Sequence, residues 1–289
     1  MAVTVKAPAK INLTLDIVGK RPDGYHNVAM VMQAVSLYDT VTVDLVDTGG
    51  VVITCDHPDV PLDDSNIAAK AADAFYRHTG IAGHSVMVDI RKVIPAQAGL
   101  AGGSTDGAAV ILALNRLLDT HLSMEEMADI GARVGADVPF TLLGGTRLAT
   151  GTGTTLQKLP HLQRCCIVIV KPVVSVSTAS AYAACDARPP KGFLYTDEVV
   201  SRLYRRDIRG VCACLYNEFE QVLTLPEIDA IKRLMMQHKA LGASMTGSGS
   251  AVYGIFNSEK RANACVNILK ENYNHVFLTT PIRTGCVIE

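Results

Sequence analysis

The chain has 289 residues, of which 48% are hydrophobic and 19% are charged. Its 27 lysines and arginines almost balance its 28 aspartates and glutamates, so the sequence lacks the strong positive charge that attracts nucleic acid. No apolar run approaches the roughly 20 residues that span a bilayer, and residues 1–6 lack the layout of a secretion signal. We therefore expect a cytoplasmic protein that acts on a small molecule, with neither nucleic acid nor a membrane as a partner.

The length predicts two domains, because a chain of this size can build two hydrophobic cores. We place the boundary near Leu159-Pro160, which gives an N-terminal domain of residues 1–159 and a C-terminal domain of residues 160–289. The eight cysteines are scattered without a C-x-x-C pair, so we expect reduced thiols that serve as small core residues.

The first third is predicted to consist mainly of strands. Hydrophobic and polar residues alternate over 10–17 and 41–45, which indicates strands with one buried face. Gly49-Gly50 ahead of an apolar run indicates a hairpin, and residues 65–80 predict a helix with Ser65 as its N-cap and Gly80 at its end. The alternation gathers polar side chains of the first strand on one face, where they could line a site: Lys10, Asn12, Thr14 and Asp16.

Later elements follow from capping signals and apolar runs. Ser123 and Glu126 form a capping box, and residues 165–170 form the nearly continuous apolar run of a strand covered on both faces. The expected order is a strand over 86–93, a helix with one apolar stripe over 110–118, a helix over 123–135, a strand over 165–170, an exposed loop over 189–192, a helix over 227–238 and a strand over 251–256.

One run of small residues carries the clearest functional signal: Pro95-Ala-Gln-Ala-Gly-Leu-Ala-Gly-Gly-Ser-Thr-Asp106, between a predicted strand and a predicted helix. Glycines let a backbone approach a ligand closely, and free N–H groups at the positive end of a helix attract phosphate. Ser104 or Thr105 would supply the helix N-cap and hydroxyl contacts to phosphate or a metal. The run is neither a Walker A motif nor a dinucleotide-binding fingerprint. It predicts a phosphate-binding loop, with a tight strand-to-helix turn as the alternative.

This run resembles the second motif of the GHMP superfamily, which comprises galactokinase, homoserine kinase, mevalonate kinase and phosphomevalonate kinase. Residues 6–13 resemble its first motif and residues 242–250 its glycine-rich third. The resemblance implies a two-domain α+β fold. Its N-terminal part would be ribosomal-protein-S5-domain-2-like and its C-terminal part a ferredoxin-like α/β sandwich, with the active site in the cleft between them.

Within the superfamily, four segments resemble the 4-diphosphocytidyl-2-C-methyl-D-erythritol kinase family: residues 10–16, 19–26, 135–139 and 217–220. The resemblance implies an enzyme of the non-mevalonate isoprenoid pathway that uses ATP and Mg²⁺ to phosphorylate the 2-hydroxyl of its substrate. The partner would be a cytidyl diphosphate of methylerythritol, and the protein a monomer or weak homodimer.

The resemblance also implies the catalytic pair. Lys10 and Asp137 match residues that flank the substrate hydroxyl, and Asp137 would take its proton. A carboxylate with a reference pKa of about 4 cannot deprotonate an alcohol in advance, so it would orient the hydroxyl and accept the proton late. An ammonium about 4 Å away would hold the carboxylate ionised, with an interaction of about 4 kcal/mol at an effective dielectric near 20. From spacing alone, Asp137 could equally be a turn residue before Pro139.

The remaining site residues are carried over in two groups. Tyr25 and His26 match the residues that grip cytosine, although a Pro22-to-Tyr25 turn is the plainer interpretation of that segment. Asn12 would hold the methylerythritol end, and Tyr182 would add a second ring against the cytosine. The nucleotide would be bound by Asn66, Pro95, Gly99, Leu100, Ala101, Gly102, Gly103, Ser104, Thr105, Thr178 and Gly247. The sequence does not indicate which residue binds the metal.

Two positions depart from the family pattern. Ala101 stands where a further glycine is usual, and we expect it in an ordinary backbone region because φ > 0 would cost alanine of order 1 kcal/mol. Thr154 stands where glutamate is common, which could mark a drifted substrate. Two alternatives therefore stay open: a GHMP kinase for another small alcohol or isoprenoid phosphate, and a non-catalytic nucleotide-binding protein on the same fold.

Overall fold

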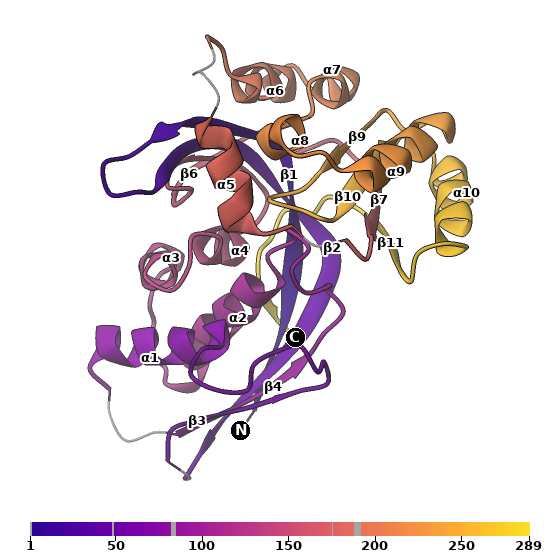
Figure 1. Cartoon of the computed structure of the whole chain (residues 1–289). Helices are drawn as coiled ribbons and strands as arrows, with labels where there is room; N and C mark the ends of the chain where they lie inside the picture. Colours follow the sequence, from indigo (N-terminus) through magenta and orange to yellow (C-terminus); the bar gives the residue numbers. More distant parts are fainter. Residues whose placement is uncertain (1, 48, 82–84, 175, 188–191) are drawn as a thin grey trace.

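The structure of the protein is a computed structural model that describes residues 2–47, 49–81, 85–174, 176–187 and 192–289 (Figure 1). Two long antiparallel strands, β1 (Val3–Lys20) and β2 (His26–Val46), run through the middle of the molecule. Helices of the N-terminal half pack on one side of this pair, and a second sheet from the C-terminal half packs against the middle of the pair on the other side. The long strands therefore connect the two parts of the fold.

The first sheet is mixed. Among the described residues its strands are β1, β2, β3 (Val51–Cys55), β4 (Ser85–Arg91), β5 (Thr146–Gly151), β6 (Thr155–Lys158), β8 (Tyr216–Asn217) and β12 (Val287–Ile288). β4 pairs antiparallel with β2, and β3 pairs parallel with β4. The predicted hairpin at Gly49-Gly50 is therefore wrong, because β4 lies between β2 and β3. The carbonyl of Gly50 accepts from the N–H of Val86 in β4 (3.0 Å), and helix α1 (Ile67–Thr79) supplies the long crossover that a parallel pair needs.

The middle of β1 is buried on both faces, so the expected single buried face is wrong for this strand. Lys10 and Asn12 are 4% and 1% exposed, and Thr14 and Asp16 are fully buried. Helix α6 (Tyr195–Tyr204) packs on β1, where the hydroxyl of Thr196 contacts both Thr14 Oγ1 and Asp16 Oδ2 (2.8 Å each). Alternation in one strand cannot reveal a covering element 180 residues away. The polar row exists, but it lies inside the protein.

Four helices cover the N-terminal part of the first sheet: α1 (Ile67–Thr79), α2 (Gly102–Leu117), α3 (Met124–Ala132) and α4 (Val138–Leu143). The N-cap of α1 is Asn66 rather than Ser65, because its side-chain oxygen accepts from the N–H of Ala68 (2.8 Å). The predicted end at Gly80 is confirmed by its left-handed φ of 69°. The capping box that opens α3 is also confirmed, although α3 ends at Ala132.

The second sheet has the order β11-β7-β10-β9 among the described residues, with β7 (Cys166–Lys171), β9 (Gly242–Met245), β10 (Val252–Phe256) and β11 (His275–Thr279). The central residues of β7 are buried, as the apolar run predicted. The predicted helix over 227–238 and strand over 251–256 are confirmed as α9 (Pro226–Gln237) and β10. The other helices of this half are α5 (Thr178–Asp186), α6, α7 (Ile208–Ala213), α8 (Glu218–Val222) and α10 (Glu259–Lys270).

Several expectations concern the chain as a whole. All eight cysteines are thiols, and five of them are buried, as expected of core residues. Within the described ranges, no helix is both long and apolar enough to cross a bilayer. Residues 189–191 of the predicted exposed loop lie outside the described residues. The boundary near Leu159 stays a prediction, since β8 and β12 of the C-terminal half pair with β1 of the first sheet.

Candidate active site

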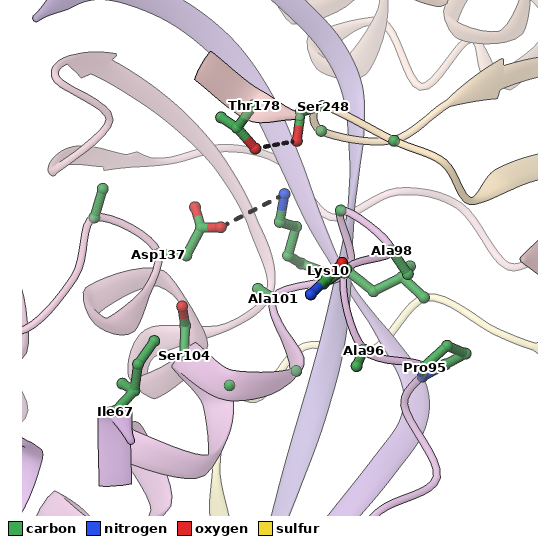
Figure 2. Close-up of a pocket in the computed structure, with 18 of the residues that line it drawn as sticks. Lys10, Ile67, Pro95, Ala96, Ala98, Ala101, Ser104, Asp137, Thr178 and Ser248 are labelled. Carbon is green, nitrogen blue, oxygen red and sulfur yellow. Dashed lines mark hydrogen bonds and ion pairs between the residues drawn. The ribbon is translucent and has the colours of Figure 1, made fainter. Parts of the chain in front are cut away.

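A cavity of about 850 Å³ lies where the glycine loop, β1 and the third glycine-rich run meet (Figure 2). This volume is in the range of small-molecule sites, about 300–1,000 Å³. The structure brings to it most of the residues predicted from the sequence: Lys10, Asn12, Asn66, Pro95, Gly99, Leu100, Ala101, Gly102, Gly103, Ser104, Asp137, Thr178, Tyr182 and Gly247. Ser248 of the third glycine-rich run also lines it, as do Lys92 and Thr152, and none of these three had been predicted as a site residue.

The glycine loop packs tightly against the third glycine-rich run. Gly99 has a φ of +75°, and a Cβ there would lie 2.1 Å from the carbonyl oxygen of Thr246, so only glycine fits. Gly247 has a φ of +56°, and a Cβ there would lie 3.0 Å from the Cα of Gly99. The two runs, about 150 residues apart in the sequence, therefore form one continuous backbone wall of the cavity.

Ala101 corrects one expectation. Its φ of 62° and ψ of 30° are left-handed, not the ordinary backbone region that we expected. The neighbours of Ala101 fix its backbone conformation. On one side, Leu100 is buried and its carbonyl accepts from the N–H of Lys10 (3.1 Å); on the other side, α2 begins directly. This geometry costs alanine of order 1 kcal/mol. The loop accepts that cost because the left-handed residue turns the chain into α2.

Helix α2 begins without a side-chain cap. Its N-cap is Ala101, so the expectation that Ser104 or Thr105 caps it is wrong, because both residues already lie inside the first turn. Ser104 lines the cavity (Figure 2), whereas Thr105 is buried with its hydroxyl 3.7 Å from the sulfur of Cys286. The uncapped N–H groups of the first turn fit an anion such as phosphate.

Lys10 and Asp137 point toward each other across the cavity (Figure 2). Lys10 Nζ lies 3.6 Å from Asp137 Oδ2 and donates to Asn12 Oδ1 (2.8 Å). Asp137 occupies the N-cap position of α4, with Pro139 in the first turn, but its side chain makes no capping hydrogen bond. The backbone of Asp137 is thus that of a turn residue before Pro139, as the alternative predicted. Its carboxylate, however, is directed at the buried ammonium of Lys10. This arrangement can orient a hydroxyl and accept its proton.

Asn12 connects β1 to the third glycine-rich run. Its side-chain oxygen accepts from Lys10 Nζ, from the N–H of Gly247 (3.0 Å) and from the hydroxyl of Thr246 (3.3 Å). Its backbone carbonyl accepts from the hydroxyl of Tyr253 (2.8 Å). These bonds hold the Lys10 ammonium in place; the predicted contact of Asn12 with substrate stays a prediction.

A second cavity of about 860 Å³ is lined by two more of the predicted residues, Tyr25 and His26, whereas Thr105 lines neither cavity. The ring of His26 stacks on Tyr182 at a centroid distance of 4.6 Å, and burial, with the nearby charge of Asp137, raises the pKa of Tyr182. Tyr25 is 68% exposed, and Asp23 accepts from its N–H (3.1 Å), so the plain turn interpretation is also correct. The second cavity therefore offers two aromatic rings and an imidazole.

The two cavities adjoin. Both are lined by Ala136, Thr152 and Tyr182, and Asp137 directly follows Ala136 in the chain. Thr154, where the family commonly has glutamate, lines the second cavity. One cleft thus has two compartments, with the pair of Lys10 and Asp137 beside their junction.

Known proteins match this chain over almost its whole length. Residues 66–145 match the N-terminal domain of GHMP kinases and residues 199–275 match their C-terminal domain. A 4-diphosphocytidyl-2-C-methyl-D-erythritol kinase of Caldicellulosiruptor saccharolyticus is 41% identical over 278 residues, covering 96% of each chain. One of Exiguobacterium sibiricum is 41% identical over 285 residues, covering 96% of this chain and 97% of the relative. The chain belongs to the 4-diphosphocytidyl-2-C-methyl-D-erythritol kinase family.

Solved structures agree with this membership. A crystal structure of 4-(cytidine 5'-diphospho)-2C-methyl-D-erythritol kinase aligns with a TM-score of 0.81 and 30% identity, covering 96% of this chain and 98% of its own. Mevalonate kinase of L. major aligns with a TM-score of 0.76 at 18% identity over 97% of this chain and 96% of its own, which shows the shared fold. The predicted GHMP kinase fold and the predicted class of enzyme, a small-molecule kinase, are confirmed.

The site fits the nucleotide that this kinase family implies, and it offers a limited set of metal ligands. The uncapped start of α2 fits polyphosphate, because its free N–H groups can donate to phosphate oxygens. The described residues contain no group of three or more histidines, cysteines, aspartates or glutamates arranged to hold a metal ion. Mg²⁺ commonly binds through substrate phosphates with only one or two protein oxygens, so such a group is not required. Ser104 lines the cavity with its hydroxyl at the start of α2.

A buried ionic cluster lies behind the glycine loop, and sequence reasoning missed it. Lys92 Nζ contacts Asp39 and lies 2.7 Å from Asp106 Oδ2, and all three side chains are at most 4% exposed. Asp39 also accepts from the N–H groups of Val93 and Ile94. Asp106 Oδ1 has no hydrogen-bond partner among the described residues, and burial raises the pKa of Asp106 to about 7. The cluster links β2 and the residues after β4 to the first turns of α2. It therefore helps to hold the start of α2, and with it the glycine loop, in place.

Proposed function

We propose that the protein transfers the γ-phosphoryl group of ATP to the 2-hydroxyl of 4-diphosphocytidyl-2-C-methyl-D-erythritol, a step of the non-mevalonate isoprenoid pathway. The observation that carries the proposal is the pair of Lys10 and Asp137 beside the junction of two adjoining cavities. Transfer needs a donor and an acceptor held end to end, with a proton acceptor where they meet. The relatives named for this reaction support the same conclusion.

ATP occupies the first cavity. The N–H groups of Gly102, Gly103 and Ser104 at the start of α2 bind its phosphates, and Asn66 lies at the adenine end. When bound, Mg²⁺ neutralises negative charge that develops on the transferred phosphoryl group. Ser104 would hold this ion together with the phosphates. Thr178 and Ser248, joined by a hydrogen bond of 2.7 Å, close the opposite wall.

Asp137 orients the acceptor hydroxyl. As the substrate oxygen bonds to the γ-phosphorus and the bond to the bridging oxygen of ADP breaks, the hydroxyl proton moves to the Asp137 carboxylate. Lys10 attracts this carboxylate and the incoming phosphoryl oxygens, and Asn12 keeps its ammonium in position. Because the hydroxyl becomes acidic as its oxygen bonds to phosphorus, the weakly basic carboxylate suffices as a late proton acceptor.

The cytidyl group occupies the second cavity. Tyr25 and Tyr182 stack on the cytosine, and the His26 imidazole contacts its polar edge. The methylerythritol end then reaches toward Asn12 and Asp137 at the junction.

Phosphorylation assays with ATP test the proposal. We compare the cytidyl compound with small alcohols that lack cytidine, such as mevalonate and homoserine. We expect kcat/KM for the cytidyl compound to be higher by about 100-fold or more, because only it fills both compartments. Equal rates would favour a GHMP kinase for another alcohol, and absence of turnover with every acceptor would favour a non-catalytic nucleotide-binding protein.

A further inference from the structure

Asp186, the last residue of α5, contacts the last residue of β1 and the first residue of β2, on either side of the turn between these strands. Its Oδ1 lies 2.6 Å from Nε2 of His26, and its Oδ2 lies 2.5 Å from Nζ of Lys20. Tyr182 is four residues earlier on the same helix, and its ring stacks on His26. Helix α5 thus holds one face of the His26 ring and one of its nitrogens at the same time. The His26 side chain is only 9% exposed.

The charge of Asp186 decides which nitrogen of His26 carries the proton. The hydrogen bond from His26 and the one from Lys20 lower the pKa of Asp186, so its carboxylate is ionised near neutral pH and can only accept hydrogen bonds. Nε2 of His26 is therefore the donor. In a neutral imidazole the other nitrogen, Nδ1, is then an acceptor.

We propose that Asp186 is a positioning residue that fixes the Nε2–H tautomer of His26, so that Nδ1 accepts from the exocyclic amino group of cytosine and rejects uracil. This inference rests on the proposed function. Cytosine carries an amino group, a donor, at the position where uracil carries a carbonyl oxygen, an acceptor. An acceptor on His26 facing that edge pairs with the first base and repels the second. Without Asp186 both tautomers of His26 become accessible, and the Nδ1–H form can donate to the uracil carbonyl.

Kinetics of Asp186→Asn test the specificity. The substrates are the cytidyl compound and its uridyl analogue, each with saturating ATP. For the wild type we expect kcat/KM to be about 100-fold lower with the uridyl analogue. In that complex two acceptors, Nδ1 of His26 and the uracil carbonyl oxygen, would face each other without a hydrogen bond. In Asp186→Asn we expect KM for the cytidyl compound to rise about 10-fold with kcat within about twofold, and the preference to fall below about 10-fold.

Two further variants separate positioning from a general effect on structure. Asp186→Glu retains the charge and should keep most of the preference for cytosine. Asp129→Asn removes an exposed carboxylate from α3 and should leave both substrates unaffected. If Asp186→Asn retained the full wild-type preference, or if Asp129→Asn lost as much of it, the inference would be overturned.

Nitrogen-15 NMR of the imidazole tests the tautomer without turnover. In the free wild-type protein we expect the proton of His26 on Nε2, and in Asp186→Asn a mixture of both tautomers. A wild-type ring with its proton on Nδ1, or an unchanged spectrum in the variant, would overturn the inference.

The proposed function and the role of Asp186 can be contradicted separately. A wild type that does not phosphorylate the cytidyl compound contradicts the proposed function, whereas one that does so, with an unchanged preference in Asp186→Asn, contradicts only the role of Asp186.

Discussion

The two compartments of the cleft are built in different ways. The first is a backbone site: the uncapped start of α2, the left-handed loop residues and the third glycine-rich run form its walls, braced by a buried ionic cluster. The second is a side-chain site, formed by an exposed turn and one face of α5, which meet through His26, Tyr182 and Asp186. A backbone site suits a phosphate chain shared by many kinases. Side chains suit a base that only some of them recognise.

Asp137→Asn gives the largest expected effect, because it removes the proton acceptor at the junction of the two compartments. We expect kcat to fall by about 10²–10⁴-fold, while KM for both substrates changes by less than about threefold. Asparagine keeps the size of the side chain, so binding should persist. Steady-state kinetics measure the change, and turnover equal to that of the wild type would exclude Asp137 from the chemistry.

Asp106→Asn probes the cluster that braces the backbone site. The pKa of Asp106 is about 7 in the folded protein, above its value of about 4 in the unfolded chain. The unfolded state therefore releases this proton first, and the contribution of Asp106 to the free energy of unfolding falls as the pH rises from about 4 to about 7.

Asparagine does not titrate, so the stability of Asp106→Asn relative to the wild type should rise across this pH window, by of order 1 to 4 kcal/mol. Urea denaturation of both proteins at pH 5 and pH 8 measures the difference. If the free energies of unfolding of the two proteins differed by the same amount at both pH values, the carboxyl of Asp106 would keep one protonation state in the folded protein from pH 5 to pH 8.

Ala101→Gly should produce the smallest effect. Glycine adopts the left-handed conformation without steric cost, but it also makes the unfolded chain more flexible. We expect a net gain in the free energy of unfolding of at most about 1 kcal/mol. Thermal and urea unfolding measure it, with Asp129→Asn as an exposed control. A clear loss of stability would show that the loop does not strain this alanine.

The same contrast explains what the sequence could predict. The glycine run indicated a phosphate loop because the chemistry of that site lies in adjacent residues. The capping box at Ser123 and the end of α1 at Gly80 are local in the same way. The conformation of Ala101 was predicted wrongly because it depends on distant contacts. The hydrogen bond between Lys10 and Leu100 and the position of α2 fix the backbone on either side of it. The hairpin at Gly49-Gly50 was wrong because β4, some 35 residues later, pairs in between.

The remaining misses are contacts between distant segments. Lys92 and Asp39 are 53 residues apart, and His26 and Asp186 are 160 apart. No periodicity or spacing relates such residues before the chain folds. Lys10 and Asp137 were paired only through the resemblance to a known family, and the structure supplies the distance of 3.6 Å between them.

Calorimetric titration of Tyr25→Ala tests the division into two compartments most directly. Tyr25 is exposed and lines only the second cavity, so its loss should not disturb the fold. We expect the affinity for the cytidyl substrate to fall by about 10-fold or more, from the lost stacking on cytosine, and the affinity for a non-hydrolysable ATP analogue to stay within about twofold. Unchanged affinity for the cytidyl substrate, or an equal loss for the ATP analogue, would contradict the account.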